Sequence, residues 1–175
     1  MSRLSATARV ILGLLKLGPR TGYDVKRVTD YSTRYFWRAS YGQIYPELRG
    51  LEADGLVCAR EEPHGRRQRR VYELTSAGEG VLAEWLGGTF EQYEVRDEGL
   101  LKLFFGELLT QDALRDLVRR RREWSERSRD EFRGIADQLG EIEGSSAEVL
   151  RFGIESMEWS VAWWADLERK LDASL

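Results

Sequence analysis

The sequence predicts a mainly α-helical protein, in which an N-terminal winged helix-turn-helix (three helices, a two-stranded wing and a fourth helix) precedes a helical C-terminal domain. Residues 1–87 follow the order helix, helix, helix, β-hairpin, helix, which is the layout of a winged helix. Residues 88–175 read as helices throughout. The charge divides similarly: residues 1–86 carry 14 Lys and Arg against 10 Asp and Glu, whereas residues 87–175 carry 13 against 20. Such asymmetry is typical of a basic head that meets an anion.

The first two helices are marked by their ends. Residues 4–17 are apolar around most of the helix circumference and stop at Gly18-Pro19, as expected of a buried helix. Thr21 can cap a second helix over residues 22–31, with Asp24 favourable in its first turn.

The third helix is predicted to start at Ser40, where Ser40-Tyr41-Gly42-Gln43 matches the S-x-x-Q capping box, and to end at Gly55. Pro46 then lies inside the helix, where a proline costs about 3 kcal/mol. Since its ring would meet the carbonyl of Gly42, which has no side chain, we expect a slight kink and a slim surface suited to close approach.

A projection of this helix at about 100° per residue separates two faces. Ile44, Leu48 and Leu51 form the stripe expected to face the core. The opposite face is small and smooth, with one amide and one guanidinium: Ala39, Gly42, Gln43, Pro46, Arg49 and Gly50. Glutamine can read adenine, and arginine can read guanine or bind phosphate. Tyr41 and Tyr45 lie between the faces. An ordinary amphipathic helix with a bland outer face is the alternative.

A polar β-hairpin is predicted next, with strands over residues 56–61 and 69–74 and a turn over residues 62–68. A solvated run of charge is the usual interpretation of its arginines. Beside the smooth helix face, they predict instead a basic wing for backbone or minor-groove contacts. The residues are Arg60, Arg66, Arg67, Arg69 and Arg70, and Tyr23, Lys26 and Arg27 add to the same basic head. A capping box at Ser76-Ala77-Gly78-Glu79 opens a fourth helix to Leu86.

The predicted boundary between domains 1–87 and 88–175 is Gly87-Gly88-Thr89. Helices are expected over residues 97–109, from Thr110 as cap to residue 139, and from the capping box Ser145-Ser146-Ala147-Glu148 to residue 171. Arg119–Arg122 is interpreted as a solvated face, because Glu123 and Glu126 stand four residues from its ends.

The last two helices carry apolar stripes that predict an antiparallel hairpin packed on a second subunit. Long helices can set the spacing of about 34 Å that a dimeric DNA reader needs. The candidate dimer residues are Leu114, Leu117, Trp124, Leu150, Ile154, Met157, Val161 and Trp164.

Trp159, Trp163 and Trp164 crowd the last helix, where positions 159 and 163 share a face and 164 is turned by about 100°. They indicate either a dimer core or an aromatic pocket for a planar apolar or phenolic effector. The candidate effector residues are Trp159, Trp163, Phe104, Phe105 and Phe152.

Enzyme motifs are missing from the sequence. It has one histidine, His64, and one cysteine, Cys58, with no metal-ligand cluster, nucleophile elbow or phosphate loop. The lone cysteine excludes an internal disulfide and fits a reducing compartment. No apolar run approaches the roughly 20 residues of a membrane span. We therefore expect a soluble cytoplasmic protein that is not an enzyme and uses no cofactor or metal.

Three stretches resemble the PadR family of bacterial transcriptional regulators: ILGLLKLGPRTGYDVKR, FWRASYGQIYPELRGLEADGLV and RRQRRVYELTSAGEGVLAEWL. RDEGLLKLFFGELL resembles the start of that family's longer C-terminal domain. The likeness covers residues 10–171 and is most specific over residues 10–86. It implies a homodimeric winged-helix protein, usually a repressor, that binds a pseudo-palindromic operator and often releases it when a small molecule binds.

By position, the resemblance implies operator contacts from Tyr23 and Lys26, from Ser40, Tyr41, Gln43 and Tyr45, and from Arg66, Arg67, Arg69 and Arg70. The stretch EPHGRRQRR, residues 62–70, is richer in arginine than the family's usual wing tip. We expect a dimeric repressor whose partners are double-stranded operator DNA, a second copy and a small aromatic or apolar effector, with no membrane. The alternative is a winged-helix protein-interaction or scaffold protein that recognises no operator.

Overall fold

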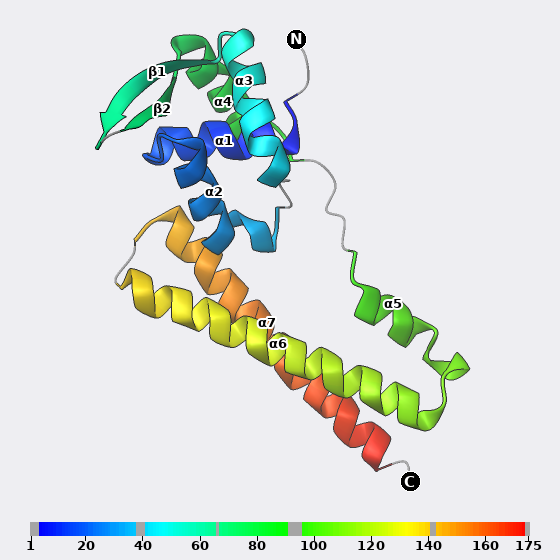
Figure 1. The fold of residues 1–175 in the computed structure, drawn as a ribbon. Helices are drawn as coiled ribbons and strands as arrows, with labels where there is room; N and C mark the ends of the chain where they lie inside the picture. The colour runs from blue at the N-terminus through cyan, green and yellow to red at the C-terminus, as the bar shows by residue number, and fades with distance from the viewer. Residues whose placement is uncertain (1–3, 38–40, 66, 91–95, 141–142, 174–175) are drawn as a thin grey trace. The chain divides into compact units, whose positions relative to one another are not determined.

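The computed structural model describes residues 4–37, 41–65, 67–90, 96–140 and 143–173 (Figure 1), and of Arg34, Tyr41, His64 and Arg67 it describes the backbone alone. The chain divides into two compact units, Met1–Gln92 and Tyr93–Leu175. The first has helices and a two-stranded wing, and the second is helical, so the predicted fold class is confirmed.

The first unit follows the predicted order of elements. Its helices are α1 (Ala6–Leu17), α2 (Gly22–Tyr31), α3 (Ile44–Ala53) and α4 (Ser76–Gly87), and its wing is the antiparallel pair β1 (Val57–His64) and β2 (Arg67–Leu74). Two 3-10 turns, η1 (Thr33–Tyr35) and η2 (Tyr41–Gln43), lie between α2 and α3. Thr21 caps α2 as predicted, and Asp24 bonds back to the Thr21 backbone to complete a capping box.

The core of this unit forms where α1, α2, α3 and the base of the wing meet. Ile11, Leu12 and Val25 are fully buried. The predicted inward face of α3 is confirmed, because exposure is at most 4% at Ile44, Leu48 and Leu51. Full burial of one such side chain contributes about 1.5–3 kcal/mol. This face therefore holds α3 to the core and leaves the opposite face to solvent.

The start of α3 differs from the prediction. The α-helix begins at Ile44, after η2, and Gln43 at the N-cap makes no side-chain cap hydrogen bond. Ser40 lies outside the described residues. Pro46 therefore occupies the first helical turn, where a backbone N–H has no partner within the helix and a proline costs little. The expectation of a proline inside the helix is wrong, and Pro46 instead helps to begin α3.

Gly55 ends α3 as predicted, with a φ of 71° that glycine adopts without strain. The backbone N–H groups of Gly55 and Leu56 donate to the carbonyls of Glu52 (3.0 Å) and Leu51 (2.9 Å). These two bonds form a Schellman motif. The motif turns the chain directly from α3 into β1, so the base of the wing is fixed beside α3.

The wing is longer than predicted. Its strands include most of the expected turn, and the register pairs Glu62 with Arg69 and Pro63 with Gln68. Gly65 remains in the turn, with a φ of 61°. Pro63 suggests a turn in the sequence, but a two-stranded sheet has free edges, where the missing N–H of a proline is tolerated.

The start of α4 packs on the junction between α3 and β1. Thr75, rather than the predicted Ser76, is the N-cap, and its hydroxyl accepts from the Gly78 N–H and donates to the Gly55 carbonyl at 2.7 Å. A Cβ at Gly78 would lie 2.0 Å from the Leu56 carbonyl oxygen. Only glycine fits this approach.

The second unit consists of α5 (Glu98–Phe104), a 3-10 turn η3 (Gly106–Leu108), α6 (Gln111–Leu139) and α7 (Ser145–Asp172). Thr110 caps α6 as predicted. The single helix predicted over residues 97–109 is wrong, because α5, capped by Asp97, ends at Phe104 and the 3-10 turn η3 follows it. The predicted capping box at Ser145 is wrong, because Gly144 is the N-cap and makes no side-chain cap bond. None of the helices within the described ranges has the length and apolar character needed to cross a membrane.

The long helices α6 and α7 form the predicted antiparallel hairpin and lie side by side (Figure 1). Ser125 and Ser160 are buried where they meet, with their hydroxyl oxygens 2.9 Å apart. Trp164 is 2% exposed. The ring of Phe132 packs on Gly153, where a Cβ would lie 3.3 Å from the ring. Small residues at these positions let two long helices approach closely.

Candidate DNA-binding interface

The outward face of α3 and of the turn before it is smooth and open to solvent. Gln43, Pro46, Arg49 and Gly50 are exposed, as is Gly42. A Cβ at Gly50 would meet no atom within 4 Å. This face therefore presents an amide and a guanidinium, both able to read base edges, on a surface without bulk. Ser40 and the side chain of Tyr41 lie outside the described part of the chain.

Tyr45 connects this face to α2. Its ring lies over Gly22, the first residue of α2, where a Cβ would come within 2.6 Å of the ring. Tyr45 is nevertheless 51% exposed. The ring thus packs on the start of α2 while about half of its surface stays accessible to a partner.

The predicted residues of α2 lie on its solvent face. Tyr23 is 65% exposed and Lys26, three residues later, is exposed as well. Positions three apart are neighbours on a helix surface. Both follow Gly22 closely, so this pair stands next to the helix start on which Tyr45 packs.

One face of the wing is fastened to α3 by an ion pair. Arg70 on β2 donates from Nη2 to both carboxylate oxygens of Glu52 on α3, at 2.8 and 2.6 Å. The Arg70 guanidinium lies 5.8 Å from the ring centre of Tyr72, which is 5% exposed. The hydrogen bond with Glu52 is the main cause that raises the pKa of Arg70. We call Glu52, Arg70 and Tyr72 the wing clasp.

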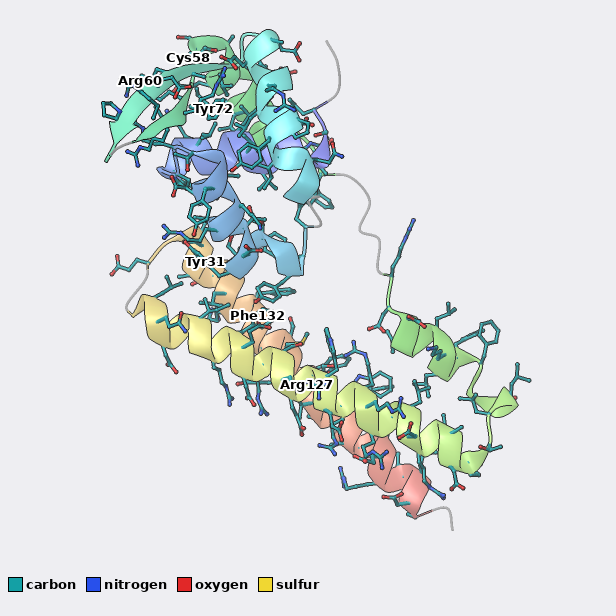
Figure 2. All side chains as sticks on the ribbon, viewed as in Figure 1. Tyr31, Cys58, Arg60, Tyr72, Arg127 and Phe132 are labelled. Atoms are coloured by element: carbon teal, nitrogen blue, oxygen red, sulfur yellow. The ribbon has the colours of Figure 1, made fainter. Side chains whose placement is uncertain are left out.

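The opposite face of the wing carries a larger ion-pair network, which includes Arg60, labelled in Figure 2. Arg20, from the turn before α2, donates to Glu62 at 2.9 Å and to Glu73 at 2.6 Å. Arg60 contacts the same two carboxylates at 3.0 and 2.8 Å, and Arg69 reaches Glu62 at 3.3 Å. Desolvation acts to raise the pKa of Glu62, but the surrounding arginines outweigh it and the pKa is lowered.

These contacts show that much of the positive charge predicted for the wing is paired with carboxylates. Arg60, Arg69 and Arg70 each hold a carboxylate, while Arg66 and the side chain of Arg67 lie outside the described residues. The sequence interpretation missed Arg20 and Glu52. Their partners stand 18 to 53 positions away, so no local pattern marks them. The available signal was the facing of Glu and Arg across the strands, which requires the register to be known.

The predicted effector residues lie in two pairs and one separate position. Phe104 and Phe105 touch edge to face at 5.1 Å beside η3, which packs on Leu114. Trp159 and Trp163 stack at 6.4 Å on α7, near the level of Ser125. Leu114 and Ser125 are eleven residues apart on α6, which is about 16 Å along the helix, so the two pairs do not lie together. Phe152 lies on α7 and is 72% exposed.

An open pocket of about 490 Å³ lies between the α5–η3 segment and α6. Its two basic side chains are paired, Lys102 with Glu98 and Arg120 with Asp116, both at 2.7 Å. Phe105 is the predicted effector residue that lines it. The full lining is Lys102, Phe105, Leu108, Leu109, Ala113, Asp116, Leu117 and Arg120.

The predicted dimer residues differ in exposure. Trp164 fills the interior of the hairpin, and Trp124 is 47% exposed. Six are partly buried: Leu114, Leu117, Leu150, Ile154, Met157 and Val161. Exposed apolar residues of this unit that the prediction did not include are Leu100, Leu101, Leu108, Leu109, Leu139 and Val149.

The arginine run of α6 is solvated only in part. Arg119 and Arg122 pair with Glu123 (3.9 Å) and Glu126 (2.6 Å) as predicted. Arg122 also reaches Glu168 of α7 at 2.7 Å, and both side chains are 24% exposed. It therefore joins the two helices of the hairpin.

Arg121 contradicts the solvated interpretation, because its side chain is 17% exposed. It donates to Asp97 at 2.5 Å and to Ser125 at 3.1 Å, and its guanidinium lies 4.2 Å from the ring centre of Trp124. A Cβ at Gly99 of α5 would lie 2.8 Å from the Cδ atom of Arg121. Arg121 thus anchors α5 to the hairpin, and the available signal was its place between Leu117 and Trp124 at three- and four-residue steps.

Family profiles match both units of the chain. Residues 11–84 match the transcriptional regulator PadR-like family, and residues 95–172 match the family described as virulence activator alpha C-term. The negative transcriptional regulator PadR of Bacillus subtilis is 32% identical over 152 residues, which cover 86% of this chain and 78% of that protein.

Solved structures agree with these matches. The structure of B. subtilis PadR with operator DNA has a TM-score of 0.84 at 27% identity, covering 93% of this chain and 97% of that one. The structure of B. subtilis PadR with p-coumaric acid has a TM-score of 0.80 at 27% identity, covering 96% of this chain and 99% of that one. The structure of the Vibrio cholerae virulence activator AphA has a TM-score of 0.76 at 26% identity, covering 98% of this chain and 100% of that one. These relatives are transcriptional regulators rather than enzymes.

Proposed function

This chain belongs to the PadR-like family of transcriptional regulators, and we propose that it is a homodimeric repressor that binds a pseudo-palindromic operator and releases it when a small aromatic molecule binds. The observation that carries the proposal is the exposed, smooth face of α3 beside an arginine-rich wing. The operator complex of a relative that matches 93% of this chain supports it. A regulator that reads operator DNA works beside the chromosome, so we place it in the cytoplasm.

The proposed reading surface is the outward face of α3. Gln43 and Arg49 would contact base edges, because an amide can pair with adenine and a guanidinium with guanine. Gly42, Pro46 and Gly50 would let the backbone approach the groove. Tyr23, Lys26, Ser40, Tyr41 and Tyr45 would contact phosphates around it, and the wing would lie along the backbone.

We propose that the second unit forms the dimer. Large apolar side chains stand exposed on α5 to α7, including Phe104 at 80% and Trp159 at 68%. Exposed apolar surface of this kind is typical of an interface. A two-fold dimer would bring two reading surfaces to half-sites about 34 Å apart.

We propose a planar aromatic acid as the effector class. The relative solved with p-coumaric acid supports this class. The Trp159–Trp163 pair offers a stacking surface, and the open pocket beside Phe105 offers mainly apolar walls, with two basic groups that are each paired with a carboxylate. Titration of a panel of aromatic acids should quench tryptophan fluorescence and weaken operator binding. An unchanged signal with unchanged operator affinity would count against an effector in this unit.

Binding to DNA fragments from the protein's own promoter region tests the main proposal. Affinity for a preferred fragment should fall by roughly 10³-fold or more between 50 and 200 mM salt if six or more phosphates are contacted. A scaffold protein would show no sequence-preferring complex at any salt concentration.

Substitutions on α3 test which surface reads the bases. Gln43→Ala and Arg49→Ala should each weaken specific binding by about 1–3 kcal/mol and leave non-specific binding nearly unchanged. Gln138→Ala, at an exposed glutamine of α6, is the control. Equal losses of specific and non-specific affinity would show that α3 does not face the groove as proposed.

A further inference from the structure

The wing clasp gives Arg70 a different task from the phosphate contact that the sequence suggests. Within the operator-binding function proposed for this chain, we propose that Arg70 is a positioning residue: held by Glu52, it sets the wing against α3 and leaves contact with DNA to other side chains. An arginine in the wing therefore need not contact DNA.

The geometry of the clasp supports this role. The Nη2 atom of Arg70 reaches both oxygens of Glu52, at 2.8 and 2.6 Å, and Tyr72 lies against the guanidinium. Tyr72 itself is fixed, because it is 5% exposed and its backbone N–H donates to the Arg20 carbonyl at 2.7 Å. The arginine is thus held between a helix and the buried base of the same strand.

The local charge also disfavours a phosphate at this position. A phosphate would have to displace a carboxylate that already accepts both contacts of Arg70. Glu61 faces Arg70 across the strands and adds a second negative charge. Like charges repel, so two carboxylates around one arginine make its surroundings poor for a phosphate but suitable for an internal bridge.

The clasp acts on the helix that carries the proposed reading surface. Glu52 follows Arg49 by three residues, so both lie on neighbouring parts of the α3 surface. The opposite face of the wing is tied to Arg20 by Glu62 and Glu73. Ties on both faces hold the wing at one angle to α3. Release of one tie would let the wing move relative to the residues that read bases.

Four variants of the full chain separate positioning from phosphate contact: Arg70→Ala, Glu52→Gln, the double variant and Glu61→Gln. The last removes one acid from the same face of the wing without cutting the clasp. For each, affinity is measured for preferred and scrambled DNA from 50 to 200 mM salt. Exposed ion pairs contribute little to stability, so all four should remain folded, with unfolding midpoints within a few degrees of the parent.

Positioning predicts a shared loss. Arg70→Ala and Glu52→Gln should each lower specific affinity about tenfold, and the double variant should lose no more than either alone, because both cut the same tie. The slope of log affinity against log salt concentration (the salt slope) and the affinity for scrambled DNA should equal those of the parent. Glu61→Gln should bind at least as well as the parent. A fifth variant, Arg70→Lys, retains a positive charge beside Glu52 and should recover part of the affinity lost in Arg70→Ala.

A direct phosphate contact predicts a different pattern. Arg70→Ala would then reduce the salt slope by about one and weaken preferred and scrambled DNA alike, and Glu52→Gln would bind equally or more tightly. Either that pattern or an Arg70→Ala variant with unchanged binding overturns the inference.

Hydrogen exchange of the backbone amides, measured without DNA, tests the wing clasp independently of the proposed DNA-binding function. Wing amides should exchange faster in Arg70→Ala and Glu52→Gln but not in Glu61→Gln. If the parent binds no DNA while the wing amides respond in this way, the clasp stands and the proposed function fails. If the wing amides do not respond, the clasp does not position the wing.

Discussion

Gly78 and Gly80 lie two residues apart in α4 and have opposite surroundings. A Cβ at Gly78 would lie 2.0 Å from the backbone oxygen of Leu56, whereas a Cβ at Gly80 would meet nothing within 4 Å. Gly78→Ala should therefore destabilise the first unit by about 3 kcal/mol or more, through overpacking against a rigid backbone. Gly80→Ala should stabilise it by about 0.5–1 kcal/mol, because alanine is the better helix former. Chemical unfolding of both variants measures the difference, and equal effects would contradict the packing at Leu56.

Asp97 makes a pH-dependent contribution to the second unit. Partial burial acts to raise its pKa, but hydrogen bonds from Arg121 and from the backbone of Leu100 outweigh this, and the pKa is lowered. A depressed carboxyl pKa stabilises the fold above the unfolded-state value, near 3.9, and the stabilisation is lost as the pH falls through the folded-state value. Asp97→Asn retains a good N-cap and removes the charge. Its stability deficit should be present at pH 7 and shrink toward pH 2 in chemical unfolding. A deficit that does not vary with pH would contradict a role for the charge.

At the scale of elements, α3 should respond to one substitution in two opposite ways. Gly50 lies on the outward face of α3 with open space around its Cα. Gly50→Ala should raise the stability of the fold by about 0.5–1 kcal/mol. It should also weaken operator binding if this face approaches DNA closely. Gly13→Ala in α1, where space is open too, should stabilise similarly and leave binding unchanged. Thermal unfolding and operator affinity of the two variants provide the test; unchanged binding in Gly50→Ala would place this face away from DNA.

Elements were predictable where their signals are local. Thr21, Gly55 and Thr110 mark helix ends because capping depends on residues within a few positions. The inward face of α3 follows from a fixed helical period. The same reasoning failed at Ser76 and Ser145, since Ser and Thr neighbours compete for one cap position and a glycine can fill it. It failed at Pro46 because proline suits a first turn, and the helix start depends on the preceding chain.

The candidate site was only partly accessible from the sequence. Tyr45 and Arg49 stand where the helical projection puts them, since both belong to α3, and Gln43 is exposed as expected although it lies in η2. The wing clasp needs three elements and a strand register, none of which composition or spacing reports. The arginines of the wing look alike in sequence. Their partners, Glu52 for Arg70 and Glu62 for Arg69, differ only after folding.

For the whole molecule, assembly and operator binding should be lost together. Trp124 is 47% exposed on α6 and contacts Arg121 from the same helix, which leaves its outer surface for the proposed second subunit. Truncation of a large apolar side chain at the centre of an interface often costs about 2 kcal/mol or more. Trp124→Gln should therefore raise the dimer dissociation constant by at least tenfold in sedimentation experiments.

Operator binding should follow from the same change. Monomers lack the fixed spacing of two heads that a pseudo-palindrome requires. At concentrations where Trp124→Gln is monomeric, it should bind a full operator no better than a half-site, whereas the parent should strongly prefer the full operator. Asp137→Ser, at an exposed position of α6 turned about 220° from Trp124, should change neither property. A Trp124→Gln protein that stays dimeric and retains full-operator binding would move the interface away from this face of α6. A monomer with undiminished full-operator affinity would instead separate DNA binding from dimer formation.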